Sequence, residues 1–250
     1  MWHRCPMPDQ HLDPTVAATY DRRVVDRFEP TLLAATADRL AGLAGDGRAL
    51  EFAIGTGRVA LPLAARGVEV HGIELSEPML AELRAKPGGD AIPVAVGDMT
   101  STRVPGAFSL VYLVFNTIGN LTTQAEQVAC FRNAAAHLSP GGHFVIEVGV
   151  PDPPRRHEPS PFRPFAMTDD HIGIDEFVDP VEQVFISHHY RPNDAASARV
   201  SGTFRYVWPS ELDLMAQLAG MEPVHRWAGW NREEFTGAST DHVSVWRRPA

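Results

Sequence analysis

Short apolar runs alternate with segments of helical spacing over the first 150 residues of the chain. Apolar runs of strand length occupy residues 48–54, 68–74, 92–96, 109–115 and 143–148. Helical spacing occupies residues 13–44, 58–66, 77–86 and 124–138, and Pro30 must break or restart the first of these segments. This alternation predicts an α/β fold with a doubly wound sheet that is buried on both faces.

The pattern changes after residue 150. Residues 151–164 are rich in proline, so we expect no regular element there. Segments with β-like composition follow at 172–178, 181–190 and 199–207, and they predict a small antiparallel layer inserted after the fifth strand. A helix at 209–219 and two strands at 221–230 and 242–247 are expected to close the fold.

Composition narrows the classes of partner. The chain has 250 residues, 44% of them hydrophobic, which is enough for one core with room for a cap. A net charge of −9 and the lack of Lys or Arg runs longer than two argue against nucleic acid and anionic membranes. The chain has only two cysteines and its N-terminus lacks a signal-peptide core, which together predict a cytoplasmic protein. Its apolar runs are only of strand length, so we expect no membrane span. The oligomeric state, monomer or homodimer, stays open.

Candidate chemistry lies where the predicted strands end, because ligands of open α/β sheets bind beyond the carboxyl ends of the strands. The first strand runs into Gly55-Thr-Gly57, whose glycines allow a tight turn and a close approach to a ligand. Together with Ala60 they satisfy the dinucleotide fingerprint of an oxidoreductase. Glu51 argues against that interpretation, because its carboxylate repels a pyrophosphate and suits a ligand that carries an ammonium and a sulfonium.

The next strand ends carry further groups of this kind. Glu74 ends the second strand, where its carboxylate can accept both hydroxyl hydrogens of a ribose. Asp98 follows the third strand and can accept from a ring amine, and Met99 offers a flat ring a soft apolar surface.

These motifs together resemble those of class I S-adenosylmethionine-dependent methyltransferases. The first motif of the family is an acid followed by a glycine-rich turn, and it reads here Glu51-Phe-Ala53-Ile-Gly55-Thr-Gly57, with Ala53 in place of the first glycine. Residues 72–80, 97–99 and 138–142 resemble the later motifs in the expected order. Within the family the chain looks most like small-molecule members of the aminosugar N-methyltransferase and glycine N-methyltransferase kind, on the grounds of residues 115–121 and the antiparallel insert.

The resemblance implies a Rossmann-like seven-stranded sheet and a division of the chain into four parts. These are an N-terminal helical cap at 1–45, an S-adenosylmethionine-binding core at 46–150, an inserted substrate cap at 151–207, and a C-terminal helix with closing strands at 208–250. The cofactor site that it implies consists of Tyr20, Glu51, Ala53, Gly55, Gly57, Arg58, Glu74, Leu75, Met79, Gly97, Asp98, Met99, Phe115 and Asn116. In this set Tyr20 resembles an aromatic lid, Arg58 meets the cofactor carboxylate, and Phe115 with Asn116 faces the sulfonium.

The implied reaction is an in-line displacement that moves a methyl group to a nitrogen or oxygen nucleophile of a small molecule. The sequence identifies no catalytic residue, and no histidine spacing is typical of a metal site. The candidates for the acceptor pocket are Tyr20, Asn116, His189, Tyr190, Arg205 and Tyr206. The alternatives are an NAD(P)-dependent oxidoreductase and a non-catalytic module that only binds the cofactor.

Overall fold

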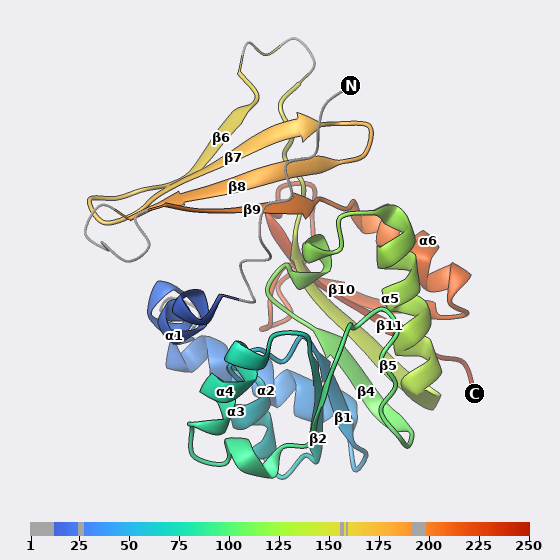
Figure 1. Cartoon of the computed structure of the whole chain (residues 1–250). Helices are drawn as coiled ribbons and strands as arrows, with labels where there is room; N and C mark the ends of the chain where they lie inside the picture. Colours follow the sequence, from blue (N-terminus) through green and yellow to red (C-terminus); the bar gives the residue numbers. More distant parts are fainter. Residues whose placement is uncertain (1–12, 25–27, 156–157, 159, 192–198) are drawn as a thin grey trace.

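The computed structural model describes residues 13–24, 28–155, 158, 160–191 and 199–250. Within these residues the larger sheet has seven strands in the order β10-β11-β5-β4-β1-β2-β3 (Figure 1). The strands are β1 (Ala49–Phe52), β2 (Val70–Glu74), β3 (Val94–Val96), β4 (Phe108–Leu113), β5 (Leu138–Gly149), β10 (Glu222–Trp227) and β11 (Asp241–Arg247). The first five run parallel, and β11 and β10 complete the sheet in antiparallel pairing. The predicted α/β fold is therefore confirmed.

Helices cover both faces of the seven-stranded sheet. They are α1 (Pro14–Arg23), α2 (Pro30–Ala44), α3 (Ala60–Ala64), α4 (Glu77–Arg84), α5 (Gln124–His137) and α6 (Pro209–Leu218), with 3-10 helices η3 (Gly89–Ala91) and η4 (Thr117–Asn120). One hydrophobic core packs α5 and α6 against the sheet, and a second packs α2, α3 and α4. Leu50 belongs to the first core and its neighbour Ala49 to the second, so β1 is buried on both faces. Among the described helices none is long and apolar enough to cross a bilayer.

Helix boundaries follow local capping chemistry. Pro30 is the first residue of α2, so the long N-terminal helical segment divides into two helices at this proline, as predicted. Ser76 caps α4, and its side chain accepts a hydrogen bond from the Met79 amide at 3.2 Å. Thr123 and Glu126 form a capping box at the start of α5.

Two predictions of irregular structure are wrong. Residues 162–164 were expected to be irregular, yet they begin the strand β6 (Phe162–Met167). This strand lies at the edge of its sheet, and its pairing slips between Pro164 and Ala166, which is where a strand tolerates proline. The fifth strand was predicted to begin at residue 143, but residues 139–142 also belong to β5, as a bulge in which Gly141 takes a φ of 80°.

A second sheet follows β5 and precedes α6. Its strands β6, β7 (Ile172–Asp179), β8 (Val184–Tyr190) and β9 (Arg199–Arg205) are antiparallel and lie in that order. The insert therefore has four strands within the described residues, one more than the sequence pattern predicts. Because β5 leads into it from its carboxyl end, the sheet stands beyond the carboxyl ends of the parallel strands (Figure 1).

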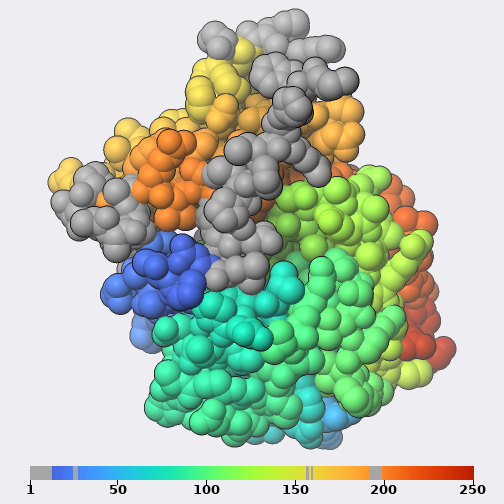
Figure 2. All heavy atoms as spheres, viewed as in Figure 1, coloured from blue at the N-terminus to red at the C-terminus, as the bar shows by residue number. Residues whose placement is uncertain are grey.

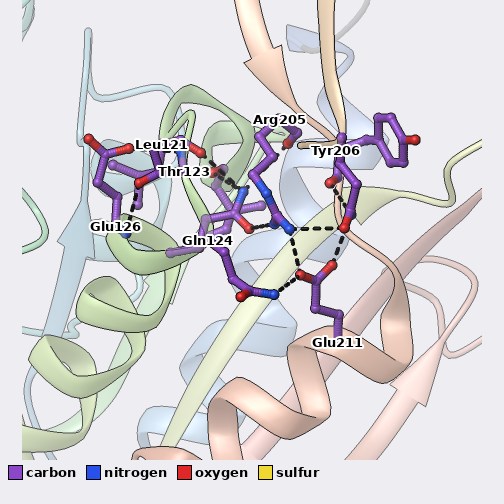
Figure 3. A network of polar contacts seen from close by, with 10 residues as sticks. Leu121, Thr123, Gln124, Glu126, Arg205, Tyr206 and Glu211 are labelled. Atoms are coloured by element: carbon purple, nitrogen blue, oxygen red, sulfur yellow. Dashed lines mark hydrogen bonds and ion pairs between the residues drawn. The ribbon is translucent and has the colours of Figure 1, made fainter. Parts of the chain in front are cut away.

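The second sheet contacts the rest of the molecule at both of its ends. At the end of β9, the guanidinium of Arg205 pairs with Glu211 of α6 at 2.6 Å and donates to Gln127 of α5 (Figure 3). At the other end, Arg191 donates to the backbone oxygen of Arg23 in α1 at 3.1 Å. In the space-filling view the orange strands accordingly stand directly above the blue α1 (Figure 2).

Candidate functional site

The glycine turn after β1 is built from left-handed backbone. Gly55 and Gly57 have φ values of 56° and 77°, which glycine adopts without strain. A Cβ on Gly57 would also lie 2.3 Å from Leu83 Cδ1, so a side chain does not fit there. Ala53 has a φ of 51°, and its Cβ makes this conformation unfavourable. The position where the family motif carries its first glycine thus still uses a glycine-like backbone.

Glu51 points into the protein just before this turn. Its side chain is only 3% exposed, and its Oε2 accepts a hydrogen bond from the Tyr112 hydroxyl at 2.9 Å. Burial raises the pKa of Glu51 to about 8, against the hydrogen bond from Tyr112 and the nearby charge of Arg58, which both lower it. A buried carboxyl group with a raised pKa is suited to a cationic ligand, because a positive charge beside it restores the ionised form.

Glu74 at the end of β2 holds the glycine turn in place. Its Oε2 accepts from the Gly55 amide and its Oε1 accepts from the Ser76 amide, both at 2.7 Å. Each carboxylate oxygen accepts up to two hydrogen bonds, so a pair of ligand hydroxyls can still donate to this group. The motif predicts the ligand role of Glu74, but it does not predict the bond to Gly55.

The residues expected beside a flat ring divide into exposed and buried ones. Leu75 is 53% exposed, and Asp98 is exposed while its Oδ1 accepts from the Thr100 amide at 2.6 Å. Met79 and Met99 are nearly fully buried, so they support the wall of the site from behind. Gly97 lies so close to the side chain of Thr102 that an added Cβ would be 2.1 Å from Oγ1.

Helix α1 brings Tyr20 over the site. Burial raises the pKa of Tyr20 to about 12, and its hydroxyl lies within the electrostatic reach of Arg58, Glu74 and Glu51. The next residue, Asp21, accepts from Thr56 Oγ1 at 2.6 Å and pairs with Lys86 Nζ at 2.5 Å. Lys86 also donates to the backbone oxygen of Thr56 at 2.7 Å. This junction fixes α1 on the glycine turn, and no sequence motif indicated it.

Phe115 and Asn116 form a strained pair after β4. Their φ values are 60° and 58°, a left-handed conformation that is unusual for a bulky residue such as phenylalanine. Glu147 of β5 holds the pair, because its Oε2 accepts from the Phe115 amide at 2.9 Å and its backbone oxygen accepts from the Asn116 amide at 3.1 Å. Asn116 Oδ1 accepts from the Gly149 amide at 2.6 Å. The guanidinium of Arg58 lies 5.4 Å from the centre of the Phe115 ring.

The same carboxylate of Glu147 reaches the C-terminal segment. Its Oε1 accepts from the indole nitrogen of Trp230 at 3.0 Å, and Trp230 is buried. Sequence reasoning missed Glu147, because a single acid in the middle of an apolar strand matches no motif. An acid within a buried strand was nevertheless a signal, since such a group requires partners.

The remaining acceptor-pocket candidates come from the second sheet and do not share one location. His189 and Tyr190 are neighbours on β8 and therefore point to opposite faces. Arg205 is buried and paired with Glu211, so its charge joins the sheet to α6. Tyr206 packs among aromatic rings, with Phe177 at 5.7 Å between centroids.

The site presents a set of groups rather than one reactive centre. Glu51 suits a cation, Glu74 suits two hydroxyls, and Leu75 with Asp98 suits a ring that carries an amine. The glycine turn lets a ligand backbone come close to all of them. Within the described ranges no three His, Cys, Asp or Glu side chains gather in a way that could hold a metal ion.

Comparison with known proteins gives a consistent result. Residues 49–142 match the family described as a methyltransferase domain. The chain is similar to the CcbJ methyltransferase from Streptomyces caelestis, with 37% identity, coverage of 94% of this chain and 96% of that one, and a TM-score of 0.82. It is 40% identical over 98 residues to a dTDP-3-amino-3,6-dideoxy-alpha-D-glucopyranose N,N-dimethyltransferase of Streptomyces fradiae, a match that spans 39% of this chain and 38% of the relative. It is also 24% identical over 246 residues to the cypemycin N-terminal methyltransferase of a Streptomyces species, over 94% of this chain and 99% of the relative.

Proposed function

We propose, from the premise that the chain belongs to the S-adenosylmethionine-dependent methyltransferases, that it methylates the amine nitrogen of an amino sugar. The similarity to a sugar N,N-dimethyltransferase supports this acceptor. S-adenosylmethionine supplies a methyl group that its positively charged sulfur activates toward a nucleophile. The protein therefore contributes mainly by holding and orienting, which is worth about 7–11 kcal/mol when geometry is good.

The residues of the site fit this cofactor. In our proposal Glu51 binds the ammonium of its methionine part, and the glycine turn lets that part approach the backbone. Glu74 accepts hydrogen bonds from the ribose hydroxyls, and Leu75 and Asp98 bind the adenine. Tyr20 closes the site from α1, and the left-handed pair Phe115–Asn116 borders the position of the acceptor.

An oxidoreductase is not favoured. Glu51 is buried directly before the glycine turn, where a dinucleotide would place its pyrophosphate. When ionised, its carboxylate repels that anion, and when protonated, it offers the anion no positive charge. A thermal-shift assay with S-adenosylhomocysteine and with NAD in separate samples tests this point. Stabilisation by NAD alone would refute the assignment of the site.

Two further features of the proposal follow from the arrangement of the chain. We place the acceptor under the insert at 151–207, so the division into cap, core, insert and C-terminal part has a functional meaning. The acidic composition supports a small-molecule partner rather than nucleic acid or a membrane surface. A cytoplasmic location is part of the proposal as well, and the chain's two cysteines, neither in a C-x-x-C pair, support it.

Methyl transfer to a defined acceptor tests the proposed function. The protein is incubated with S-adenosylmethionine and dTDP-3-amino-3,6-dideoxy-alpha-D-glucopyranose, and products are identified by mass spectrometry. We expect one or two methyl groups on nitrogen and no transfer to a matched sugar nucleotide with a hydroxyl in place of the amine. A short peptide with a free α-amine is the third sample, because one relative is the cypemycin N-terminal methyltransferase.

The outcomes separate the alternatives. Methylation of the peptide alone would replace the amino sugar with a peptide amine as acceptor. Methylation of the hydroxyl control would refute the choice of nitrogen. Tight binding of S-adenosylhomocysteine without transfer to any of the three compounds would favour the non-catalytic module.

A further inference from the structure

The loop that follows β3 lies against one face of α5 (Figure 1). Cys130, Asn133 and His137 follow one another at spacings of three and four residues, so they share a face of this helix, and all three are buried. Burial raises the pKa of the Cys130 thiol, and the charge of Asp98 at the start of the loop raises it further. This face of α5 therefore packs beside the residue that we expect to contact adenine.

Asn133 holds the loop directly after Asp98. Its Nδ2 donates to the backbone oxygen of Met99 at 2.7 Å and to that of Thr102 at 3.1 Å. Between these two points the loop turns tightly, because the backbone oxygen of Asp98 accepts from the amides of Ser101 and Thr102. Carbonyl oxygens only accept hydrogen bonds, so the amide nitrogen of Asn133 must face them. One buried side chain thus fixes both sides of the turn.

The other end of the same amide has no partner. Asn133 Oδ1 is buried and accepts no hydrogen bond from the described residues. An unpaired buried acceptor is unfavourable, and a leucine of nearly the same shape would avoid it. The chain carries this polar group in its core despite the penalty, and the two bonds to the loop are what the group provides.

His137 holds the far end of the loop. Its Nε2 accepts from the Val104 amide at 2.9 Å, and its Nδ1 lies 2.8 Å from the backbone oxygen of Asn133. Since that oxygen can only accept, Nδ1 carries the proton and Nε2 is the acceptor. Burial lowers the pKa of His137, against the bond to Asn133 and with the charge of Arg103. The ring therefore stays neutral, which is the form that the bond to Val104 requires.

We propose that Asn133 and His137 are positioning residues that give the cofactor site its selectivity for adenine, because they fix the loop that carries Asp98. This inference rests on the proposed contact of Asp98 with the ring amine of adenine. Asp98 Oδ1 accepts from the Thr100 amide at 2.6 Å, which directs the carboxylate and leaves Oδ2 for the amine. Hypoxanthine has an oxygen in place of this amine, and the carboxylate repels it. A loop held in one position distinguishes the two bases, and a loop without these bonds distinguishes them less.

Two cofactor analogues test the role of Asn133. The protein is titrated by calorimetry with S-adenosylhomocysteine and with S-inosylhomocysteine, which carries hypoxanthine in place of adenine. We expect the wild-type protein to bind the adenine analogue at least about tenfold more tightly, since only that analogue donates to the charged carboxylate. Asn133→Leu keeps the shape of the side chain and removes both donors, and the ratio of the two affinities should fall below about threefold. In the Asp98→Ala background the same substitution should leave the ratio unchanged.

Gln127→Met is the matched control for the loss of a buried amide. Gln127 is also buried on α5, and its Nε2 donates to the backbone oxygens of Ile118 and Leu121 at 3.1 and 3.2 Å. These residues follow β4 rather than β3, so Gln127→Met should keep the wild-type ratio of affinities. A fall of the ratio equal to that in Asn133→Leu would show that any disturbance of α5 has this effect, and the positioning role would be overturned.

His137 gives a second pair of variants, which decides the matter if Asn133→Leu does not fold. His137→Phe keeps an aromatic ring but cannot accept from the Val104 amide, so the ratio should fall by at least about threefold. His137→Gln has a side-chain oxygen that can accept this bond, and it should keep most of the wild-type ratio. A cooperative melting transition establishes that each variant is folded.

The outcomes separate this inference from the proposed function. Failure of the wild-type protein to bind S-adenosylhomocysteine would refute the proposed cofactor site. Equal binding of the two analogues by the wild-type protein would refute the contact of Asp98 with adenine, and the positioning role with it. A wild-type ratio in folded Asn133→Leu or in His137→Phe would overturn the positioning role alone.

Discussion

Cofactor binding should depend on pH through Glu51, because the proposed partner of an ammonium is a carboxyl group with a pKa of about 8. Binding requires Glu51 ionised and the α-amino group of the ligand protonated. This amine shares its carbon with a free carboxylate, so its pKa lies above the value of about 7.7–8.0 for a peptide α-amino group, and it stays mostly protonated up to pH 8. From pH 8 to pH 6 the ionised fraction of Glu51 falls from about one half to about one hundredth. Affinity therefore falls about 50-fold, or about 2.3 kcal/mol. Well above pH 8 the loss of the ammonium lowers it again.

Calorimetric titration with S-adenosylhomocysteine from about pH 5.5 to about pH 9.5 measures this profile, because the interval spans the pKa of Glu51. Glu51→Gln should bind at least tenfold more weakly near pH 8 and should lose the acid limb, while the exposed Glu222→Gln should behave as the wild-type protein does. An acid limb that persists in Glu51→Gln would show that another group titrates, and the placement of the ammonium would then be refuted.

The raised pKa of Glu51 also makes the stability of the cofactor-free protein depend on pH. Its pKa in the folded state lies above the unfolded value of 4.5, so its stabilising contribution is complete below pH 4.5 and is lost as the pH rises through 8. The loss amounts to a few kcal/mol over this window. Glu51→Gln should therefore melt at a higher temperature than the wild-type protein at pH 8 without cofactor, and a lower melting temperature would contradict the burial argument.

Three further predictions concern stability. Ala53→Gly should raise the free energy of unfolding by about 0.5–1 kcal/mol in urea titrations. Removal of the Cβ relieves the left-handed backbone at this position, and this gain exceeds the entropy that a glycine loses on folding. A clear destabilisation would refute this argument. Arg205→Met should lower the free energy of unfolding by about 3–5 kcal/mol, since it leaves the partly buried Glu211 carboxylate without its cation, and a loss below about 1 kcal/mol would refute the importance of the pair. Burial lowers the pKa of His242 to about 4, so the unfolded state binds a proton at a higher pH than the folded state does, and the free energy of unfolding falls as the pH drops from 6.5 to 4. His242→Gln should flatten this pH dependence of the melting temperature. An unchanged slope would mean that another group causes it.

The sequence predicts the parallel core well because its signals are local. Buried strands give continuous apolar runs, and Ser76 and Pro30 mark helix starts through chemistry that involves only neighbouring residues. The insert was less predictable. The strand β6 begins in a proline-rich stretch, and only its position at a sheet edge, a property of the folded chain, makes Pro164 acceptable there.

The same distinction applies to the candidate site. Glu51, Glu74 and the glycines lie within motifs, and their spacing alone indicates a ligand. Asp21 and Glu147 contact residues that are 35 and 32 positions away in sequence, Thr56 and Phe115 respectively. No periodicity or motif connects such residues, so their roles emerge only when the chain is folded. For the same reason the sequence indicated His189 but not His171, whose Nε2 lies 2.9 Å from His189 Nδ1 and which precedes the neighbouring strand β7.

The junction of Asp21 with Thr56 and Lys86 has a consequence for the order of events during a catalytic cycle. Helix α1 carries Tyr20, and it contacts the glycine turn through Asp21 and the second sheet through Arg23. A movement of α1 that opened the cofactor site would therefore also break its contact with the sheet that we place over the acceptor. We therefore expect the two sites to open together, so that spent cofactor and methylated product leave after the same movement of α1.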